Sequence, residues 1–402
     1  MKILIKTFLL FFVFISISFS QEEDKEKKYF IPPYTINFII EQEFTPKSES
    51  YPGFLTNRGE FQKLKRLSGN GKGIKVGIVD TGLDYTHSRS GGELELGKAV
   101  IEVKDFSDSR TRRGYPSWVD NAGHGTHVAG HIGARANGVG IEGIASECDL
   151  YIAKGLGDRS FGTETMISNS IVWLISKDVD IINLSIGGGY ASRIEAAIKL
   201  ARSKGILVFA AMGNESTNTD NHPGNSKYTF GITAIDYQYR VAPFSSRSNM
   251  ADFSGFGVNI FSTINNGRYA EFSGTSMSSP DQAGIAALIL GYSRKIGKPI
   301  EGMDEYLNFV LPGTADLGVD GKDVEYGYGF IVLDKLIKEN ESQPPITPEE
   351  PEIIPDDPFG PITPEEPSIP IIPAPPIDPF ENYKKVGEMI IQGKKYILLE
   401  EK

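Results

Sequence analysis

The sequence predicts an α/β fold in which helices cover both faces of a mainly parallel sheet. Short apolar runs bounded by Gly, Asp or Asn are typical of buried strands. They occur at residues 74–79, 150–153, 181–186, 206–211 and 230–235. Helical patterns alternate with them, at residues 125–136, 164–176 and 193–203. Such alternation builds a parallel sheet covered on both faces, and ligands bind outside the carboxyl ends of its strands.

Composition separates a globular body from an unusual tail. Of the 402 residues, 40% are hydrophobic and 23% are charged, as in soluble globular proteins. Residues 344–379 hold 14 of the 24 prolines and eight acidic residues but no basic ones, so they supply −8 of the net charge of −11. The rest of the chain has a net charge of only −3 and no excess of basic residues, which argues against a nucleic-acid partner. Cys148 is the one cysteine, which excludes an intramolecular disulfide.

Residues 1–20 have the pattern of a cleaved signal peptide. Two lysines precede an uncharged, mostly apolar run at residues 8–19, and Ser18 and Ser20 are the small residues expected before cleavage at Gln21. A membrane anchor is the weaker alternative, because about twelve apolar residues fall short of the roughly 20 that span a bilayer. We therefore expect a secreted or otherwise extracytoplasmic protein.

The next segment, residues 21–53, is too short to be a domain. A charged run at residues 22–28 is followed at residues 29–44 by a partly apolar stretch that could pair as a strand. The main α/β domain is expected at residues 54–340.

Two polar residues of this domain follow expected strands. Asp80 ends the first strand and precedes Thr81, so its carboxylate is placed at the functional edge of the sheet; a helix cap is the other use of such an Asp. Asn214 ends the word FAAMGN, where its amide can aim donors at the same edge, although Gly-Asn after a strand is usually a turn.

A histidine and a serine stand where helices are expected to begin. His124 lies in residues 120–130 (DNAGHGTHVAG), where flanking glycines allow close backbone approach. Ser276 precedes a long apolar helix and is either its cap or a nucleophile beside the positive helix end. A metal site on His127 and His131 is disfavoured, because the glutamate of HExxH is missing, so we expect structural roles for both.

Together these words resemble the subtilisin-like serine proteases, or subtilases. The resemblance is carried by the order Asp80, His124, Asn214 and Ser276 and by the words DTG, HGTHVAG, AAMGN and GTSMxSP around them. It covers about seven-tenths of the chain. No serine sits in a GxSxG elbow, which disfavours an α/β-hydrolase.

The resemblance implies a three-layer α/β/α fold and a serine endopeptidase that acts through an acyl-enzyme. Ser276 would attack the carbonyl, His124 would remove its proton, and Asp80 would orient the imidazole. Asn214 and the Ser276 backbone N–H would form the oxyanion hole.

The resemblance also implies polypeptide substrates. We further expect a monomeric enzyme with no required cofactor. Substrate would pair with Ser185, Ile186 and Gly187 as an antiparallel strand, with Ala211 and Gly213 on one wall of the primary specificity pocket. Residues 219–224 (TDNHPG) would approach the base of that pocket, where Asp220 or Asn221 would tolerate polar or basic side chains better than a purely apolar floor would.

Three departures from the family pattern lead to further expectations. Asp281 and Gln282 stand in a helix that is normally buried, so they need partners. Ser88-Arg89 occupies the region of a common calcium ligand, and the loop at residues 136–140 is short, so we expect no strong calcium site. A full prodomain does not fit before residue 54, which leaves residues 29–44 as a short inhibitory strand or activation without processing.

The tail has two expected parts. Residues 341–380 repeat the word PITPEEP and predict an acidic polyproline II spacer, of roughly 110 Å over 36 residues, or a tail without function. Residues 381–402 predict a β-hairpin that must pack on its own catalytic domain, on a second copy or on a surface outside the chain. An idle subtilase scaffold that binds through this tail is the rival to the protease.

Overall fold

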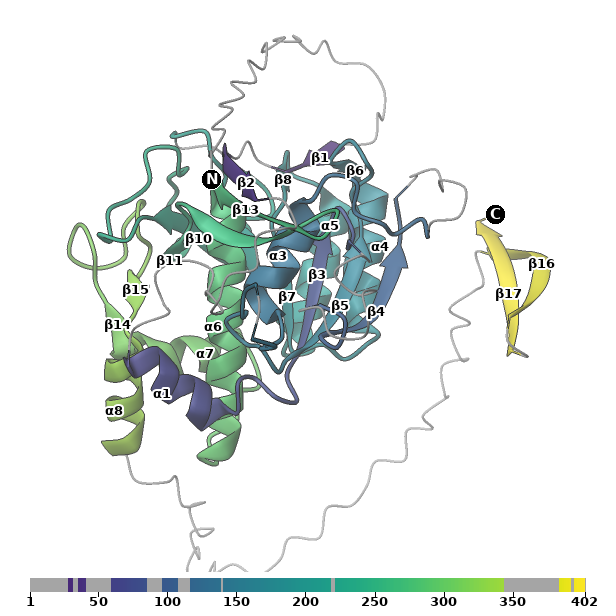
Figure 1. Cartoon of the computed structure of the whole chain (residues 1–402). Coiled ribbons are helices and arrows are strands. Elements are labelled where there is room, and N and C mark those ends of the chain that lie inside the picture. The colour runs from purple at the N-terminus through teal and green to yellow at the C-terminus, as the bar shows by residue number, and fades with distance from the viewer. Residues whose placement is uncertain are drawn as a thin grey trace, which may run out of the picture. The chain divides into compact units, whose positions relative to one another are not determined.

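The computed structural model describes residues 28–31, 35–40, 59–84, 96–107, 116–138, 140–217, 221–342, 383–391 and 394–401 (Figure 1). The chain divides into two units, residues 1–346 and residues 347–402. Among the described residues, no helix is both long and apolar enough to cross a membrane.

The first unit is built on a seven-stranded sheet in which every neighbouring pair of strands is parallel. In sheet order its strands are β11 (Ala251–Phe256), β10 (Phe230–Ile235), β9 (Leu207–Ala211), β7 (Ile181–Leu184), β3 (Lys75–Asp80), β5 (Asp149–Lys154) and β4 (Val100–Asp105). The five inner strands are those expected from the sequence, with small shifts in their ends. The parallel prediction is therefore confirmed.

The two edge strands, β4 and β11, were not predicted, for different reasons. β4 (VIEVKD) leaves its residues exposed or half-buried, so it has no apolar run. β11 (ADFSGF) is fully buried, but its Asp, Ser and Gly interrupt the apolar pattern.

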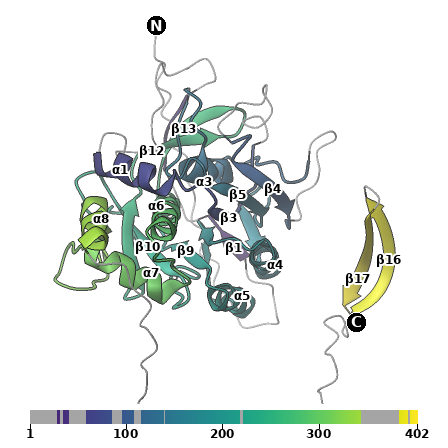
Figure 2. The same cartoon turned by 90° about the horizontal axis from the view of Figure 1, so that it is seen from below.

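Helices cover both faces of the sheet, as Figure 2 shows from below. One face carries α3 (His124–Gly133) and α6 (Thr275–Lys295), and the other carries α4 (Glu164–Ile175) and α5 (Ser192–Ser203). Within β3, Val76 and Ile78 join the core of the first face and Val79 joins that of the second. The result is the three-layer α/β/α arrangement.

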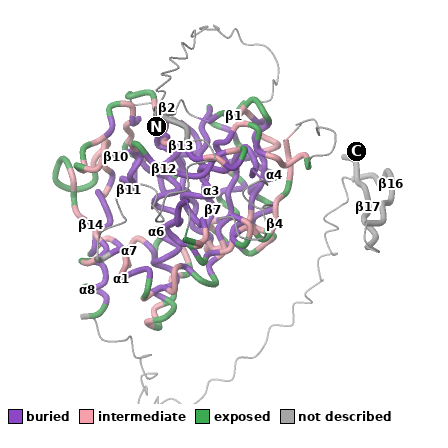
Figure 3. The backbone as a smooth tube through the Cα atoms, in the orientation of Figure 1, coloured by how far each residue is buried: buried purple, intermediate pink, exposed green. Residues whose placement is uncertain are grey.

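Helix α6 runs through the centre of the first unit, and it is buried from Thr275 to Ser293 (Figure 3). A helix that is enclosed on all sides has no polar face, which explains its apolar run. The described residues also form the helices α1 (Gly59–Ser68), α7 (Met303–Val310) and α8 (Leu333–Ser342) and the 3₁₀ turn η2 (Leu311–Gly313).

The described residues of this unit also form three small antiparallel sheets. Their strand orders are β6 (Phe161–Thr163), β1 (Lys28–Phe30), β8 (Gly187–Gly188); β12 (Ile260–Ile264), β13 (Arg268–Ser273), β2 (Thr35–Ile40); and β14 (Thr314–Ala315), β15 (Phe330–Ile331). The stretch at residues 29–44 thus contributes to two strands in two different sheets.

The second unit contains an antiparallel hairpin, β16 (Tyr383–Ile391) and β17 (Lys394–Glu401). This is the hairpin expected at the end of the chain. The proline-rich residues between the units lie outside the described part of the structure.

Candidate active site

Asp80 and His124 form a buried pair at the carboxyl end of β3. The Nδ1 atom of His124 lies 2.9 and 3.0 Å from the two carboxylate oxygens of Asp80, and both side chains are fully buried. The backbone N–H of Thr81 donates to Asp80 Oδ1 at 2.7 Å. Because a carboxylate only accepts hydrogen bonds, Nδ1 carries the hydrogen, and the lone pair of the neutral imidazole lies on Nε2.

Asp120 holds the loop that delivers His124. Its buried carboxylate accepts hydrogen bonds of 2.7–3.0 Å from Thr81 Oγ1, from the backbone N–H groups of Ala122, Gly123 and Thr126, and from Thr126 Oγ1. Thr81 Oγ1 in turn accepts from the Gly125 N–H at 2.8 Å. The chain after β3 is therefore tied directly to the start of α3.

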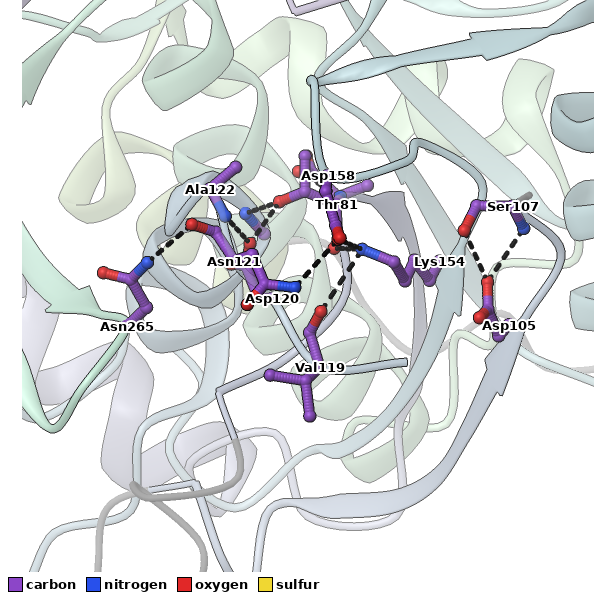
Figure 4. Close-up of polar contacts among 12 residues, drawn as sticks. Thr81, Asp105, Ser107, Val119, Asp120, Asn121, Ala122, Lys154, Asp158 and Asn265 are labelled. Atoms are coloured by element: carbon purple, nitrogen blue, oxygen red, sulfur yellow. Dashed lines mark hydrogen bonds and ion pairs between the residues drawn. The ribbon is translucent and has the colours of Figure 1, made fainter. Parts of the chain in front are cut away.

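Lys154, at the end of β5, supports the same region from the next strand. Its fully buried ammonium donates to the Thr81 carbonyl at 2.6 Å and the Val119 carbonyl at 3.3 Å, and it pairs with Asp158 at 3.3 Å (Figure 4). A buried ammonium requires such partners, so this one fixes the two chain segments that flank the Asp80–His124 pair.

Gly125, the residue after His124, lies where the backbone of α3 closely approaches the chain after β3. A Cβ atom on Gly125 would collide with the Gly82 carbonyl oxygen and would lie 3.2 Å from Asp80 Cβ. Only glycine lets α3 come this near to β3.

Ser276 is buried in the first turn of α6, and the neighbouring Ser185 is bonded to it twice. Ser276 Oγ donates to the Ser185 carbonyl at 3.4 Å, and Ser185 Oγ donates to the Ser276 carbonyl at 2.9 Å. Helix α6 begins at Thr275, so Pro280 lies in its second turn and not in the first turn, where proline is usually tolerated. Its missing N–H would have bonded the Ser276 carbonyl, and the Ser185 hydroxyl takes that place.

Asn214 follows β9 and its amide is oriented by the start of α6. Asn214 Oδ1 accepts from the Thr275 N–H at 2.8 Å and from Thr275 Oγ1 at 2.9 Å. The Gly213 N–H donates to Thr275 Oγ1 at 3.1 Å, and Gly213 has φ 102°, a conformation that favours glycine. With the amide oxygen held in this way, the amide NH₂ is the group left to donate elsewhere.

The remaining expected site residues lie at the same edge of the sheet. Ser185 and Ile186 are buried directly after β7, Gly187 is in β8, and Ala211 ends β9. Asn221 is buried, and its side chain packs directly on Gly187, where a Cβ atom would collide with it. Thr219 and Asp220 lie outside the described residues.

The N-terminal strand β1 lies between β6 and β8, paired antiparallel with both. Tyr29 is opposite Gly162 and Gly188, and Phe30 is opposite Phe161 and Gly187. The segment at residues 185–187 was expected to pair with extended substrate, and one of its residues, Gly187, is paired here with the chain's own N-terminal segment. Figure 1 shows β1, β6 and β8 side by side.

The other two histidines of α3 have structural surroundings. The ring of His127 stacks on Phe272 with centroids 4.2 Å apart, its Nε2–H donates to the Ile260 carbonyl at 3.0 Å, and burial lowers its pKa well below the ordinary value. His131 Nε2 lies 3.7 Å from Asp281 Oδ1. No group of three or more His, Cys, Asp or Glu in the described part of the chain could hold a metal ion.

The burial of Asp281 and Gln282 is matched by partners only in part, because Asp281 Oδ1 and Gln282 Oε1 have no hydrogen-bond partner among the described residues. Asp281 Oδ2 accepts from the Phe256 N–H at 3.2 Å and from Gln282 Nε2 at 3.3 Å. The calcium expectation concerned Ser88 and Arg89, which lie outside the described residues, and residues 136–140, of which 139 is not described.

The model of the subtilase family matches residues 71–329, which include Asp80, His124, Asn214 and Ser276. The chain belongs to the subtilase family. Its three-layer fold with a parallel sheet is the one that the sequence resemblance implied.

Individual subtilases are similar over more than half of the chain. The Minor extracellular protease Epr of Bacillus subtilis is 31% identical over 73% of this chain and 43% of its own length. Subtilisin E of the same organism is 37% identical over 55% of this chain and 56% of its own. The Intracellular serine protease of Paenibacillus polymyxa is 38% identical over 54% of this chain and 67% of its own. The chain thus spans only about half the length of Epr and of subtilisin E.

Sequence reasoning missed three residues that shape this edge of the sheet: Asp120, Glu195 and His222. Asp120 stands in the quoted word around His124, and an Asp a few residues before a helix is a recognisable N-terminal partner for backbone N–H groups. Glu195 and His222 have no local signal, because they meet only through the fold.

Proposed function

We propose that this subtilase is a serine endopeptidase that hydrolyses peptide bonds through an acyl-enzyme on Ser276. The observation that carries the proposal is the buried contact between His124 Nδ1 and the Asp80 carboxylate. It leaves the Nε2 lone pair to take the Ser276 proton during attack and to return it to the leaving amine. Asp80 holds the tautomer and stabilises the imidazolium that forms.

Asn214 and the Ser276 backbone N–H supply the oxyanion hole in this proposal. The bonds from Thr275 to Asn214 Oδ1 support the role, because they turn the amide NH₂ toward other acceptors. Ser276 lies in the first turn of α6, where free N–H groups and the helix dipole favour developing negative charge. Donors of this kind typically contribute about 10²–10³ in kcat.

The substrates are extended polypeptides that add a strand between β6 and β8. The position of β1 supports this proposal, because it shows that both edges accept an antiparallel strand. The same segment then acts as a built-in inhibitor that must be displaced or removed before substrate binds. Ser185, Ile186, Gly187, Ala211 and Gly213 remain the proposed substrate contacts.

We further propose export, a monomeric state and activity without a required cofactor. Export is supported by the lysines and apolar run at residues 1–20, and one similar relative carries the name extracellular protease. The absence of a strong calcium site is tested by thermal unfolding. A melting temperature that rises by many degrees in calcium over chelator would contradict it.

The test is cleavage of an unfolded polypeptide by the full chain and by Ser276→Ala. We expect peptide products from the wild type and a loss of at least about 10⁴-fold in rate for the variant. The rival is an idle scaffold that binds through its tail. Equal and negligible cleavage by two folded chains would favour that rival.

A further inference from the structure

The side chain of Tyr29 occupies a site formed by Gly188, Gly189, Glu195 and His222, which we call the tyrosine site. Tyr29 is fully buried, whereas its neighbour Phe30 is 42% exposed. A Cβ atom on Gly188 would lie 3.1 and 3.2 Å from two carbon atoms of the Tyr29 ring. The ring therefore lies close to the Gly188 backbone, in space that a side chain at this position would reduce.

The hydroxyl group of Tyr29 has a fully specified set of partners. It donates its one hydrogen to the Gly189 carbonyl oxygen at 2.6 Å. His222 Nδ1 lies 3.0 Å from the same hydroxyl oxygen, so Nδ1 must be the donor in that contact. The site thus binds a hydroxyl group that donates one hydrogen bond, to Gly189, and accepts another, from His222.

The second ring nitrogen of His222 fixes the protonation state of the pair. His222 Nε2 lies 3.1 Å from Glu195 Oε2, and an ionised carboxylate only accepts. Both ring nitrogens of His222 therefore carry hydrogen, as an imidazolium paired with the Glu195 carboxylate. His222 must therefore carry one proton more than a neutral histidine in order to bind both the tyrosyl hydroxyl and Glu195.

The other titratable groups around His222 are compatible with this state. The ring of Tyr190 meets the His222 ring edge at 5.3 Å and is 58% exposed. Burial, followed by the acidic Glu164 and Glu195, raises the pKa of Tyr29 far above its ordinary value. The hydroxyl stays neutral and keeps its hydrogen for the Gly189 carbonyl.

The strand register relates the tyrosine site to the nucleophile. Tyr29 is opposite Gly188 and Phe30 is opposite Gly187. In a bound polypeptide that keeps this register, the third residue after the tyrosine lies opposite Ser185. The Ser185 carbonyl accepts from Ser276 Oγ, so the attacked carbonyl belongs to that third residue.

We propose that Glu195, His222 and the backbone of Gly188 and Gly189 form a substrate subsite that selects tyrosine. The selected side chain belongs to the residue three positions before the one whose carbonyl Ser276 attacks. Tyr29 is the intramolecular occupant of this subsite in the intact chain. The inference rests on the proposed protease function and adds its substrate preference.

The chemistry predicts discrimination against phenylalanine that weakens as pH rises. Phenylalanine would leave the Gly189 carbonyl and the His222 N–H without the hydroxyl between them. At higher pH, neutral His222 keeps the Nε2 hydrogen for Glu195 and presents a lone pair to the hydroxyl. A single hydroxyl hydrogen cannot serve both Gly189 and Nδ1, so one hydrogen bond is lost.

The experiment compares two fluorogenic peptides that differ only in Tyr or Phe at this position. The measured quantity is the ratio of their kcat/KM values with the full chain, from about pH 5 to about pH 8, where histidines generally titrate. The effect of pH on the catalytic step and displacement of the N-terminal segment are common to both peptides, so they cancel in the ratio. We expect a Tyr:Phe ratio of about tenfold at low pH that falls several-fold at high pH.

Two variants separate recognition from folding. His222→Leu should bring the ratio to about one, because the hydroxyl loses its donor. The conservative Glu195→Gln, at a site that is 20% exposed, should keep part of the preference and flatten its pH dependence.

Each outcome bears on a definite claim. A wild-type ratio near one, or a ratio that His222→Leu does not change, would overturn the tyrosine subsite. Cleavage of neither peptide by a chain that also leaves unfolded polypeptide intact would instead overturn the proposed protease function. The two failures are therefore distinguishable.

Discussion

Two histidine–carboxylate pairs lie near the carboxyl ends of the central strands. They differ in which ring nitrogen of the histidine the carboxylate binds. In the Asp80–His124 pair the carboxylate binds Nδ1 at 2.9 Å, and both side chains are fully buried. In the Glu195–His222 pair the carboxylate binds Nε2 at 3.1 Å, and the side chains are 20% exposed for Glu195 and 2% exposed for His222. The same two functional groups thus present opposite ring nitrogens to their surroundings.

The difference teaches that the partner of the second nitrogen decides what the pair can do. His124 in its neutral tautomer keeps a lone pair on Nε2, which a base needs for proton transfer. His222 donates from both nitrogens, so it has no lone pair and can only bind. His131 and Asp281, 3.7 Å apart in the core, form neither arrangement at hydrogen-bond distance.

The largest expected effect comes from exchanging the two acids for their amides. Asp80→Asn should lower kcat by about 10⁴, because the amide favours the wrong imidazole tautomer. Glu195→Gln should lower kcat/KM for the tyrosine peptide by no more than about tenfold, since only a recognition contact changes. Steady-state kinetics with that peptide measures both. Similar losses in the two variants would break the distinction between a proton-transfer pair and a binding pair.

A smaller effect is expected when the occupant of the tyrosine site is shortened. Tyr29→Ala should raise the activity of the intact chain by about tenfold or more, because burial of the ring and its hydroxyl bonds hold the inhibitory strand in place. Phe30→Ala is the matched control, because its side chain is exposed and contributes less. Initial rates on an unfolded polypeptide give the comparison. Equal rates for both variants would show that β1 is not anchored through Tyr29.

The smallest effect concerns His127, a buried histidine without an acidic partner. Burial lowers its pKa in the folded state below the unfolded value of about 6.5, so the unfolded chain binds more protons as pH falls. The free energy of unfolding therefore falls as pH drops below about 6.5, by up to about 1.4 kcal/mol per pH unit from His127. His127→Gln should reduce the fall in unfolding free energy between pH 7 and pH 5 by about 2 kcal/mol.

Urea unfolding in the Ser276→Ala background measures this effect without autolysis. The absolute stability of the variant does not decide the matter, because glutamine also changes packing against Phe272. The slope of stability against pH does. An unchanged slope would mean that His127 is protonated in the folded protein.

The inner part of the fold could be predicted because its signals are local. The five inner strands are buried on both faces, so each one is a short apolar run that the sequence displays directly. The edge strands β4 and β11 gave no such run, since one is partly exposed and the other carries polar residues and glycine. Pairing with a neighbour, which the sequence does not display, makes them strands.

The candidate site was predictable to a similar degree. Asp80, His124, Asn214 and Ser276 each stand at the end of a strand or the start of a helix, within words that resemble one family. The tyrosine site was not predictable, because Tyr29 and His222 are 193 residues apart in the chain. The substitution of the Ser185 hydroxyl for the N–H that Pro280 lacks is likewise visible only in three dimensions.

Labelling with a fluorophosphonate probe tests the central claim, that His124 and Asp80 activate Ser276, most directly. The wild type and Tyr29→Ala are treated side by side, each with its Ser276→Ala counterpart, and intact mass is read. We predict one adduct on the wild type, faster labelling of Tyr29→Ala, and none on either counterpart. A folded Tyr29→Ala chain that stays unlabelled would contradict the account. In that variant the N-terminal strand is loosened, so blocking of the site by this strand could not explain the missing adduct.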